Sequence, residues 1–498
     1  MRKILSIMLI AMLALSPLSA GGKKESKIDN DISLVRTRTG AEPDSLDPYK
    51  SAAADTDAVM HNIYRGLVDY NEKGEIIPAL ATSWDISEDG RAYTFHLRDD
   101  VLFHNGEKFT SEDVVYWYER LAGLNGEEAL YSKMTMIESV KAVDENTVEV
   151  KLESADAAFL PIAKIALMPA GYTMSETKPV GAGPYRFVSY TPGEKIVMER
   201  FDEYYGEAPS IEKAEFYIIS DESAAVTALE SGQLDIANVS AVNAPVLERD
   251  FDIYSFPQNM VCLFALNNTV KPFDDIRVRQ AMNYAINRDE IIQGAFDGYG
   301  TPLYTGFSPV MGFYYNDALE NYYPYDVERA KALLAVAGYP DGFAVTITVP
   351  SNYQPHIDTA QIISEQLKKV GVKAEIKLVE WGAWLEDVYS NAEYQTTVVG
   401  LAGKLDPYDI LLRYTTTYRR NFVRYSNTEY DEIIKEAADE NDQEKRAELY
   451  KEAEKLLTED AVSVFTLDPN LVVASRRDLK GYTPYPVNFM DLTKLHYE

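Results

Sequence analysis

The stretch Cys262-Leu-Phe-Ala-Leu-Asn-Asn268, followed closely by Pro272-Phe-Asp-Asp-Ile-Arg-Val-Arg-Gln280, decides how this chain is organised. The apolar run from Val261 to Leu266 predicts a buried strand, and two asparagines that tolerate turn geometry come after it. Pro272 and two aspartates then open a predicted helix, whose apolar positions recur at helical spacing: Val278, Met282, Ala285 and Ile286. We interpret the stretch as a crossing of the chain from one lobe into another.

A second predicted crossing is Val462-Ser-Val-Phe-Thr-Leu-Asp-Pro-Asn470. Two crossings between the same lobes make a hinge. The length agrees with this division, because 498 residues exceed one ordinary hydrophobic core and are expected to form two or three domains.

The composition is that of a soluble globular protein with an acidic surface. Hydrophobic residues make up 46% of the chain and charged residues 26%, an ordinary balance. The 79 acidic and 48 basic residues leave a formal net charge of −31, which repels phosphate backbones. We therefore expect no nucleic-acid partner and attribute the acidity to solubility.

The first 20 residues have the pattern of an export signal that is cleaved from the mature protein. Two basic residues precede a short apolar core at 4–15, and small residues end the segment near Ala20. A polar lead at 21–30 follows. Because Gly21 stands where a lipid-anchored protein needs a cysteine, we expect a periplasmic or otherwise extracytoplasmic protein with no lipid anchor.

Cys262 is the single cysteine of the sequence, and it lies in the predicted buried strand. An exported protein with one cysteine has no internal disulfide, so packing must supply its stability. We expect this thiol to be a small buried hydrophobe rather than a reactive group.

Helices and strands alternate in the second half of the chain. Strands are predicted at 344–349, 372–379 and 395–400, with helices between them, which favours a largely parallel sheet covered on both sides. The predicted domains are a signal peptide at 1–20, a flexible lead at 21–30, a first lobe of 31–47, 179–265 and 471–498, an extra α+β domain at 48–178, and a second lobe at 266–470.

The motifs of common enzymes and metal sites are missing from the sequence. The five histidines lack the spacing of a zinc site, so we expect no metal held by protein side chains alone. Gly181 and Gly183 lack the third glycine of a dinucleotide fingerprint, because Arg186 stands there. No nucleophile elbow or phosphate-binding loop occurs. We therefore expect no catalytic residues, no cofactor and no enzyme activity.

The segment from Val398 to Asp409 is the most informative candidate site. A buried strand ends there, and ligands bind at strand ends in open α/β sheets. The small residues Ala402 and Gly403 would let an extended ligand approach the backbone and add as a strand. An ordinary polar loop with its turn at Asp406 remains the alternative. Trp384 is interpreted as a possible pocket wall.

Several motifs in register carry a family resemblance that covers nearly all of the chain after the signal. They are Glu42-Pro-Asp-Ser-Leu-Asp-Pro48, Tyr64-Arg-Gly-Leu-Val-Asp-Tyr70, Pro78-Ala-Leu-Ala-Thr-Ser-Trp84, Phe95 to Gly106, Phe109-Thr-Ser-Glu-Asp-Val114, Gly181-Ala-Gly-Pro-Tyr185, Arg277 to Asn287, Ala330 to Pro340, and Glu380-Trp381. The sequence resembles the extracytoplasmic solute-binding proteins of ABC importers, in the family that contains the dipeptide-, oligopeptide- and nickel-binding proteins.

This resemblance implies an α/β fold of the periplasmic-binding-protein type, with two lobes joined by a two-strand hinge and an extra α+β domain on the first lobe. It further implies a monomer that encloses its ligand between the lobes and docks on a membrane permease driven by a separate ATPase. In peptide-binding relatives the ligand lies extended between two segments, which carry over here as backbone contacts at Ser51, Ala52, Ala53, Ala54, Leu401, Ala402 and Gly403.

Two departures from the family pattern concern the ligand. Peptide-binding relatives place an aspartate after the glycine that matches Gly403, to hold the peptide amino terminus, and here the residue is Lys404. Two like charges ~4 Å apart repel by about 4 kcal/mol at an effective dielectric constant of 20. Either Asp406 or Asp409 replaces that aspartate, or Lys404 meets an anionic group. The arginine that dipeptide-binding relatives carry near 350–355 is also absent, which disfavours a free dipeptide.

Three readings of function follow. The first is a receptor for a peptide-like solute, and the second gives the same transporter role to an oligosaccharide, an opine-like compound or chelated nickel. The third, a secreted hydrolase, is disfavoured because no catalytic constellation is present. A role in adhesion or signalling stays open because folds are reused for new functions.

Overall fold

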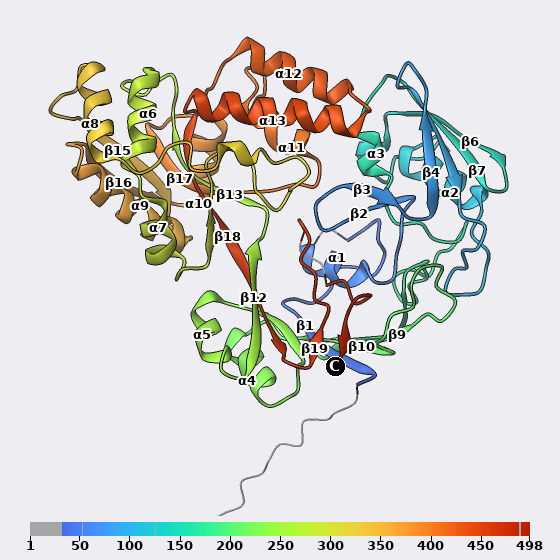
Figure 1. Cartoon of the computed structure of the whole chain (residues 1–498). Coiled ribbons are helices and arrows are strands. Elements are labelled where there is room, and N and C mark those ends of the chain that lie inside the picture. Colours follow the sequence, from blue (N-terminus) through green and yellow to red (C-terminus); the bar gives the residue numbers. More distant parts are fainter. Residues whose placement is uncertain (1–31, 52, 125, 488–489) are drawn as a thin grey trace, which may run out of the picture.

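The structure is a computed structural model that describes residues 32–51, 53–124, 126–487 and 490–498 (Figure 1). The predicted signal peptide at 1–20, the predicted lead at 21–30 and the predicted site residue Ala52 lie outside the described residues. Within the described ranges, every helix is too short or too polar to span a bilayer.

One long strand, β18 (Ser463–Arg476), belongs to both lobes and crosses between them (Figure 1). Its first half pairs with β13 (Met260–Leu266) in the second lobe, and its second half pairs with β12 (Phe251–Pro257) in the first. Gln258 and Asn259 join β12 to β13 and form the other crossing. Asn259 has a φ of 62°, a left-handed conformation that asparagine adopts more readily than most residues. The lobes are thus joined by two adjacent crossings.

The predicted position of the first crossing is wrong. The run from Val261 to Leu266 lies in β13, inside the second lobe, between β17 (Thr396–Ala402) and β18. The chain therefore enters the second lobe just after Pro257, before the predicted boundary at residue 265. The apolar run is buried because it is a central strand of a sheet, and the chain bends at the polar residues that precede it.

A four-stranded sheet with the order β1-β10-β9-β8 forms the base of the first lobe. Asp235 is fully buried and ties this sheet to β18, because it forms ion pairs with Arg36 at 3.1 Å and with Arg476 at 3.0 Å. The elements of this lobe are β1 (Leu34–Thr39), β8 (Tyr185–Thr191), β9 (Lys195–Arg200), β10 (Lys213–Ile218), α4 (Glu222–Glu230), β11 (Ile236–Val239), η2 (Ala241–Asn243), α5 (Ala244–Leu247), β12, β19 (Leu479–Lys480) and β20 (His496–Tyr497).

The extra domain is an antiparallel sheet with the order β4-β5-β7-β6 and a few short helices. Phe95 of this domain and Phe216 of the first-lobe sheet belong to one continuous hydrophobic core, so the domain is packed firmly onto the first lobe. Its elements are α1 (Ala54–Met60), β2 (Val68–Tyr70), β3 (Ile76–Pro78), β4 (Ala81–Ile86), β5 (Ala92–Leu97), α2 (Ser111–Ala122), η1 (Ser132–Met134), β6 (Ile137–Asp144), β7 (Thr147–Leu152) and α3 (Phe159–Ile162).

The second lobe has a sheet that is covered on both faces. Successive residues of β13 alternate between two hydrophobic clusters, with Val261 and Leu263 in one and Cys262 and Phe264 in the other. Cys262 is buried as predicted. The expected largely parallel sheet is only partly correct, because β15 (Ala344–Pro350) is parallel to its two neighbours, while β17, β13 and β18 pair antiparallel.

Local signals for the helices of this lobe are confirmed. Asp275 caps α6 by accepting a hydrogen bond from the Arg277 amide, and Asp326 caps α8 in the same way. The remaining elements are α6 (Ile276–Ala285), α7 (Arg288–Ala295), β14 (Gly300–Pro302), η3 (Asp317–Leu319), α8 (Val327–Val336), α9 (Gln354–Lys368), β16 (Lys373–Val379), α10 (Trp381–Ala383), the π-helical η4 (Trp384–Ser390), α11 (Pro407–Leu411), η5 (Leu412–Tyr414), α12 (Thr428–Asp439) and α13 (Gln443–Glu459).

A buried carboxylate holds the two crossings of the hinge together. Asp468 of β18 accepts a hydrogen bond from the Ser308 hydroxyl at 2.6 Å and from the Gln258 amide at 3.2 Å. Burial raises the pKa of Asp468 to about 7, although these hydrogen bonds and those from the amides of Asn259 and Met260 oppose the rise. The hinge therefore contains an acid that titrates close to neutral pH.

Replacing this acid by an amide is expected to change the pH dependence of stability. The carboxyl of Asp468 stays protonated in the folded protein up to about pH 7 but ionises near pH 4 in the unfolded chain. Its contribution to stability is therefore complete below pH ~4 and is lost as the pH rises through 7, a difference of up to about 4 kcal/mol. Asp468→Asn should be more stable than the wild type at pH 8 and similar to it near pH 4.

Urea denaturation at pH 5, 6.5 and 8 measures this effect. Asp387→Asn is the matched control, because Asp387 is exposed and the substitution removes the same charge from the same lobe. If the unfolding midpoints of wild type and Asp468→Asn change in parallel over the whole pH range, the assignment of Asp468 as the titrating group is wrong.

Candidate ligand-binding cleft

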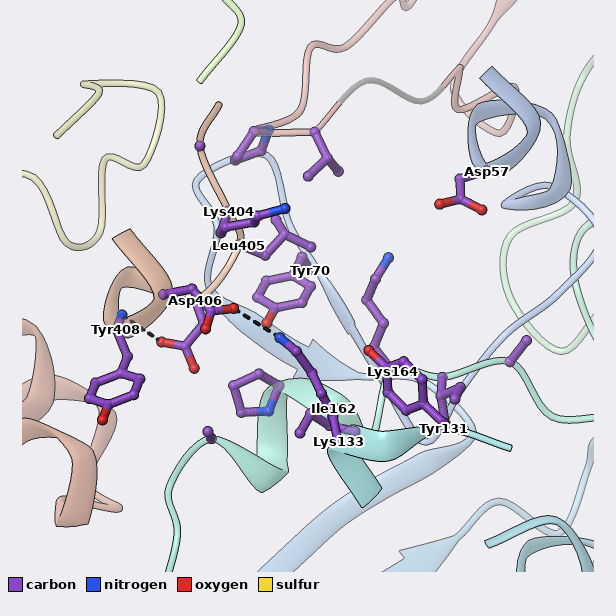
Figure 2. A pocket seen from close by; sticks show the side chains of 18 of the residues that line it. Asp57, Tyr70, Tyr131, Lys133, Ile162, Lys164, Lys404, Leu405, Asp406 and Tyr408 are labelled. Carbon is purple, nitrogen blue, oxygen red and sulfur yellow. Dashed lines mark hydrogen bonds and ion pairs between the residues drawn. The ribbon is translucent and has the colours of Figure 1, made fainter. Parts of the chain in front are cut away.

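A cleft of about 1100 Å³ lies between the lobes beside the hinge. Its walls come from the extra domain and the segment before it on one side, and from the loop after β17 with parts of α12 and α13 on the other. Residues 258–260 of the hinge and 486–487 near the carboxyl end complete the lining. Figure 2 shows the lysines, aspartates and tyrosines that face this space. A ligand in the cleft would touch both lobes and the hinge.

The predicted site segment at the end of β17 is attached directly to the hinge. The Gly403 amide donates to the Asn259 carbonyl at 2.6 Å, and the Asn259 side-chain amide donates to the carbonyls of Lys404 at 3.2 Å and Pro486 at 3.0 Å. A Cβ on residue 403 would lie 2.2 Å from both oxygens of Asn259, so only glycine fits there. Bending at the hinge therefore moves this segment with it.

These contacts limit how the segment can hold a ligand through its backbone. The amide of Gly403 and the carbonyl of Lys404 are both bound to Asn259, and the carbonyl of Ala402 accepts from the Arg413 side chain at 3.2 Å. Leu401 packs against the second-lobe core, whereas Ala402 and Gly403 line the cleft. A ligand could bond to the Gly403 amide only if its bond to Asn259 were released, whereas the two carbonyls each keep a second lone pair for a ligand donor.

Both aspartates expected as replacement anchors are already paired. Asp406 is buried and accepts from the Arg446 guanidinium at 3.1 and 3.2 Å, and it also caps α11. Asp409 forms an ion pair with Lys133 of the extra domain at 3.0 Å, which links the two walls of the cleft. Neither carboxylate offers an unoccupied charge for a ligand amine in this arrangement.

Lys404 differs from these neighbours. It is exposed and lines the cleft, and Figure 2 shows its side chain extended into the open space. Among the described residues, no hydrogen bond or ion pair of its ammonium group is found. The loop therefore presents one uncompensated positive charge to the cleft.

On the opposite wall, the predicted residue Ser51 lines the cleft, and its hydroxyl donates to Asp44 and to Asp57. The Ala53 amide donates to Asp44 at 3.0 Å and is thus also used within the protein, and Ala54 opens α1. Asp57 of α1 faces the cleft as well.

Sequence reasoning missed several lining residues, above all Asp57 and Lys164. Burial raises the pKa of Asp57, while the hydrogen bond from Ser51 and the charge of Lys164 oppose the rise. Burial, with the charge of Arg65 adding to it, lowers the pKa of His61 to about 4, so this histidine is neutral at pH 7. Asp57 lies three residues after the predicted contact segment that ends at Ala54, so its place in the cleft could have been predicted. No local sequence signal marks Lys164 as a lining residue.

The structure places Trp384 in the core of the second lobe and not in the cleft. Its side chain is 1% exposed, its indole N–H donates to the Thr397 hydroxyl at 3.0 Å, and it stacks on Trp381 at a ring distance of 5.2 Å. Trp384 is the first residue of the π-helical η4 and one of its buried residues. Trp381 is the more exposed of the two indoles.

Trp384→Phe is therefore expected to act on stability rather than on binding. The loss of the buried hydrogen bond to Thr397 and of part of the ring should lower the free energy of unfolding by about 2 kcal/mol. Ligand affinity measured by calorimetry should stay within about twofold of the wild type. A large loss of affinity at unchanged stability would show instead that the Trp384 ring contributes to ligand binding.

Two lobes on a two-stranded hinge, with a cleft between them, are the arrangement expected of a solute-binding protein. Within the described residues, no group of three or more histidine, cysteine, aspartate or glutamate side chains is placed to hold a metal ion. The profile of the bacterial extracellular solute-binding proteins, family 5 Middle, matches residues 75–422. The chain belongs to this family.

Similar proteins bind several kinds of solute. The dipeptide-binding protein of Escherichia coli K12 is 29% identical over 500 residues, with 92% of each chain covered. The structure of DppA from Helicobacter pylori in complex with the peptide STSA has 28% identity and a TM-score of 0.67, and covers 93% of this chain and 98% of that one. AgaA of A. tumefaciens R10, in complex with agropinic acid, has 29% identity and a TM-score of 0.65, with 93% and 99% covered.

Proposed function

We propose that this protein captures a peptide-like solute between its two lobes and delivers it to the permease of an ABC importer, which a separate ATPase drives. The observation that carries the proposal is the cleft itself, because it is lined by both lobes and its second-lobe segment is bonded to the hinge residue Asn259. Closure would follow from a higher affinity of the closed arrangement for ligand. The protein acts by binding, without turnover, as a monomer outside the cytoplasm.

The similar proteins support a peptide as the solute, because one is named for dipeptides and another is solved with a tetrapeptide. The groups in the cleft suit such a ligand, since tyrosines and aliphatic side chains alternate with charged ones. A non-peptide acid is the second candidate, because AgaA is solved with agropinic acid. In this chain, the observation that favours an acidic non-peptide ligand is the positive charge of Lys404, which follows Gly403.

A peptide library screened by thermal shift tests the proposal. A peptide at 100 times its dissociation constant should stabilise the folded protein by about 2.7 kcal/mol. Mass spectrometry of the small molecules that copurify with the protein provides an unbiased second readout. If no peptide stabilises the protein and the copurifying molecule is not a peptide, the second candidate replaces the first.

Closure itself has a separate signature. Small-angle scattering of the same protein should give a smaller radius of gyration with bound ligand than without it, because the two lobes approach each other about the hinge. Identical scattering curves with and without a ligand of proven affinity would contradict capture by closure.

A further inference from the structure

We propose that the captured solute carries a carboxylate that is received by Lys404, with the positive charge of Lys164 adding from the opposite wall of the cleft. This inference rests on the proposed function and assigns a chemical class to the ligand. The carboxylate belongs either to the carboxyl terminus of a peptide or to an acidic side chain, and the experiments below separate these sources.

Charged groups of both signs line the cleft. They are Arg65, Lys133, Lys164, Lys404 and Arg446, together with Asp57, Asp156, Asp406, Asp409 and Asp439. Arg446 pairs with Asp406, Lys133 with Asp409, and Arg65 with Asp69. These pairs satisfy the charges on which a ligand acid would otherwise depend.

Lys404 is the cation of this set whose ammonium group lies exposed in the cleft without a hydrogen bond or ion pair to another described residue. Its backbone is held in place all the same, because its carbonyl is bound by Asn259 and the preceding glycine is packed against that residue. The side chain therefore starts from a fixed point beside the hinge. A charged group on a fixed backbone pays less conformational entropy on binding than one on a mobile loop.

Lys164 stands on the first-lobe side of the same space. Figure 2 shows the side chains of Lys164 and Lys404 reaching into the same open region from different walls. The carboxylates of Asp57 and Asp69 are close enough to Lys164 for its charge to lower their pKa values, so they offset part of its charge. Lys404 is therefore the main determinant, and Lys164 adds to the positive potential.

The other acids of the cleft are gathered elsewhere. Asp156 lies near Asp406, Arg446 and Asp439, and burial followed by the charges of these carboxylates raises its pKa. Of these acids, Asp406 is already paired with Arg446, so it does not compete with a ligand carboxylate for Lys404.

Closure of the lobes makes this charge selective. When the walls approach, the Lys404 ammonium group loses water, which costs free energy because the effective dielectric constant falls. A ligand carboxylate beside it offsets that cost, whereas a neutral amide does not. The proposed selectivity is therefore expressed in the closed state and appears as a difference in affinity.

The test uses the mature protein and a peptide identified in the library screen, prepared in four forms. These combine a free or amidated carboxyl terminus with a glutamate or glutamine side chain. Calorimetry should show that the wild type binds at least one acidic form about 10- to 100-fold more tightly than the form with neither acid. The form that retains the preference identifies which carboxylate Lys404 receives.

Lys404→Met removes the charge and keeps the length of the side chain. It should abolish the preference for the acidic form, whereas Lys404→Arg should retain most of it and Lys404→Asp should reverse it. Because the Lys404 side chain is exposed, the melting temperatures of these variants should equal that of the wild type. Lys141→Met, on the exposed face of β6, is the matched control and should bind all four forms as the wild type does.

The outcomes separate the inference from the proposed function. If the wild type binds acidic and neutral forms equally well, or if Lys404→Met keeps the full preference, the inference is overturned and the protein remains a peptide receptor. Failure of the wild type to bind any peptide would contradict the proposed function as well. The preference should also weaken with added salt, and neutral forms should be insensitive to it.

Discussion

Arg446→Met is expected to destabilise the second lobe by about 3–5 kcal/mol, because it leaves the carboxylate of Asp406 buried without a partner. The Arg446 side chain is 4% exposed, and its guanidinium donates to both oxygens of Asp406 and to the carbonyl of Ala437. Methionine fills much of the same volume but supplies no donor. The free energy of unfolding, measured by urea denaturation, reports this loss.

The neighbouring residue on the same helix provides a matched control. Lys445 pairs with Asp442 at 3.6 Å, but its side chain is 70% exposed, so Lys445→Met should change the stability by less than about 0.5 kcal/mol. A double variant, Asp406→Asn with Arg446→Met, should recover part of the loss because no charge remains buried. If Arg446→Met and Lys445→Met lower the stability equally, loss of the Asp406–Arg446 pair does not explain the effect of Arg446→Met.

Gly403→Ala is expected to reduce ligand affinity at least tenfold and to lower stability by about 1–3 kcal/mol. The added Cβ would lie 2.2 Å from the Asn259 carbonyl oxygen and from its side-chain oxygen, and one of these is backbone that cannot rotate away. The cleft segment and the hinge must therefore separate. Their hydrogen bonds, from the Gly403 amide to Asn259 and from Asn259 to Lys404, would be lost with that movement.

Gly382→Ala is the control for this prediction, because a Cβ at residue 382 meets no atom within 4 Å. It should leave affinity and stability near those of the wild type. Adding Asn259→Gly to Gly403→Ala removes the side-chain clash but not the backbone one, so only partial recovery is expected. Normal affinity of Gly403→Ala would mean that the segment can leave the hinge without consequence for binding.

Local patterns were enough to predict much of the fold. Asp275 caps a helix as predicted, and the face of Val278, Met282 and Ala285 is buried, because caps and helical spacing depend on residues within a few positions of each other. The same holds for the run from Val261 to Leu266, which forms a buried strand. The two-lobed fold was predicted from the family motifs, which can be identified in the sequence without knowledge of tertiary contacts.

The site depended on contacts that sequence patterns do not record. An apolar strand looks the same on either side of a crossing, so the hinge was predicted several residues after its actual place at Gln258 and Asn259. Trp384 was expected to line the pocket, but its indole is buried in the core of the second lobe.

By itself, the sequence determined the class of protein, the helices and strands near their bounds, and the presence of Lys404 after Gly403. Only the tertiary structure decided which charges in the cleft are already paired, since Asp409 finds Lys133 and Asp406 finds Arg446 across long separations in the chain. The physical reason is that charge pairing depends on distance in space and on exclusion of water. Both are properties of the folded chain, and together they leave one lysine beside the hinge to meet the ligand.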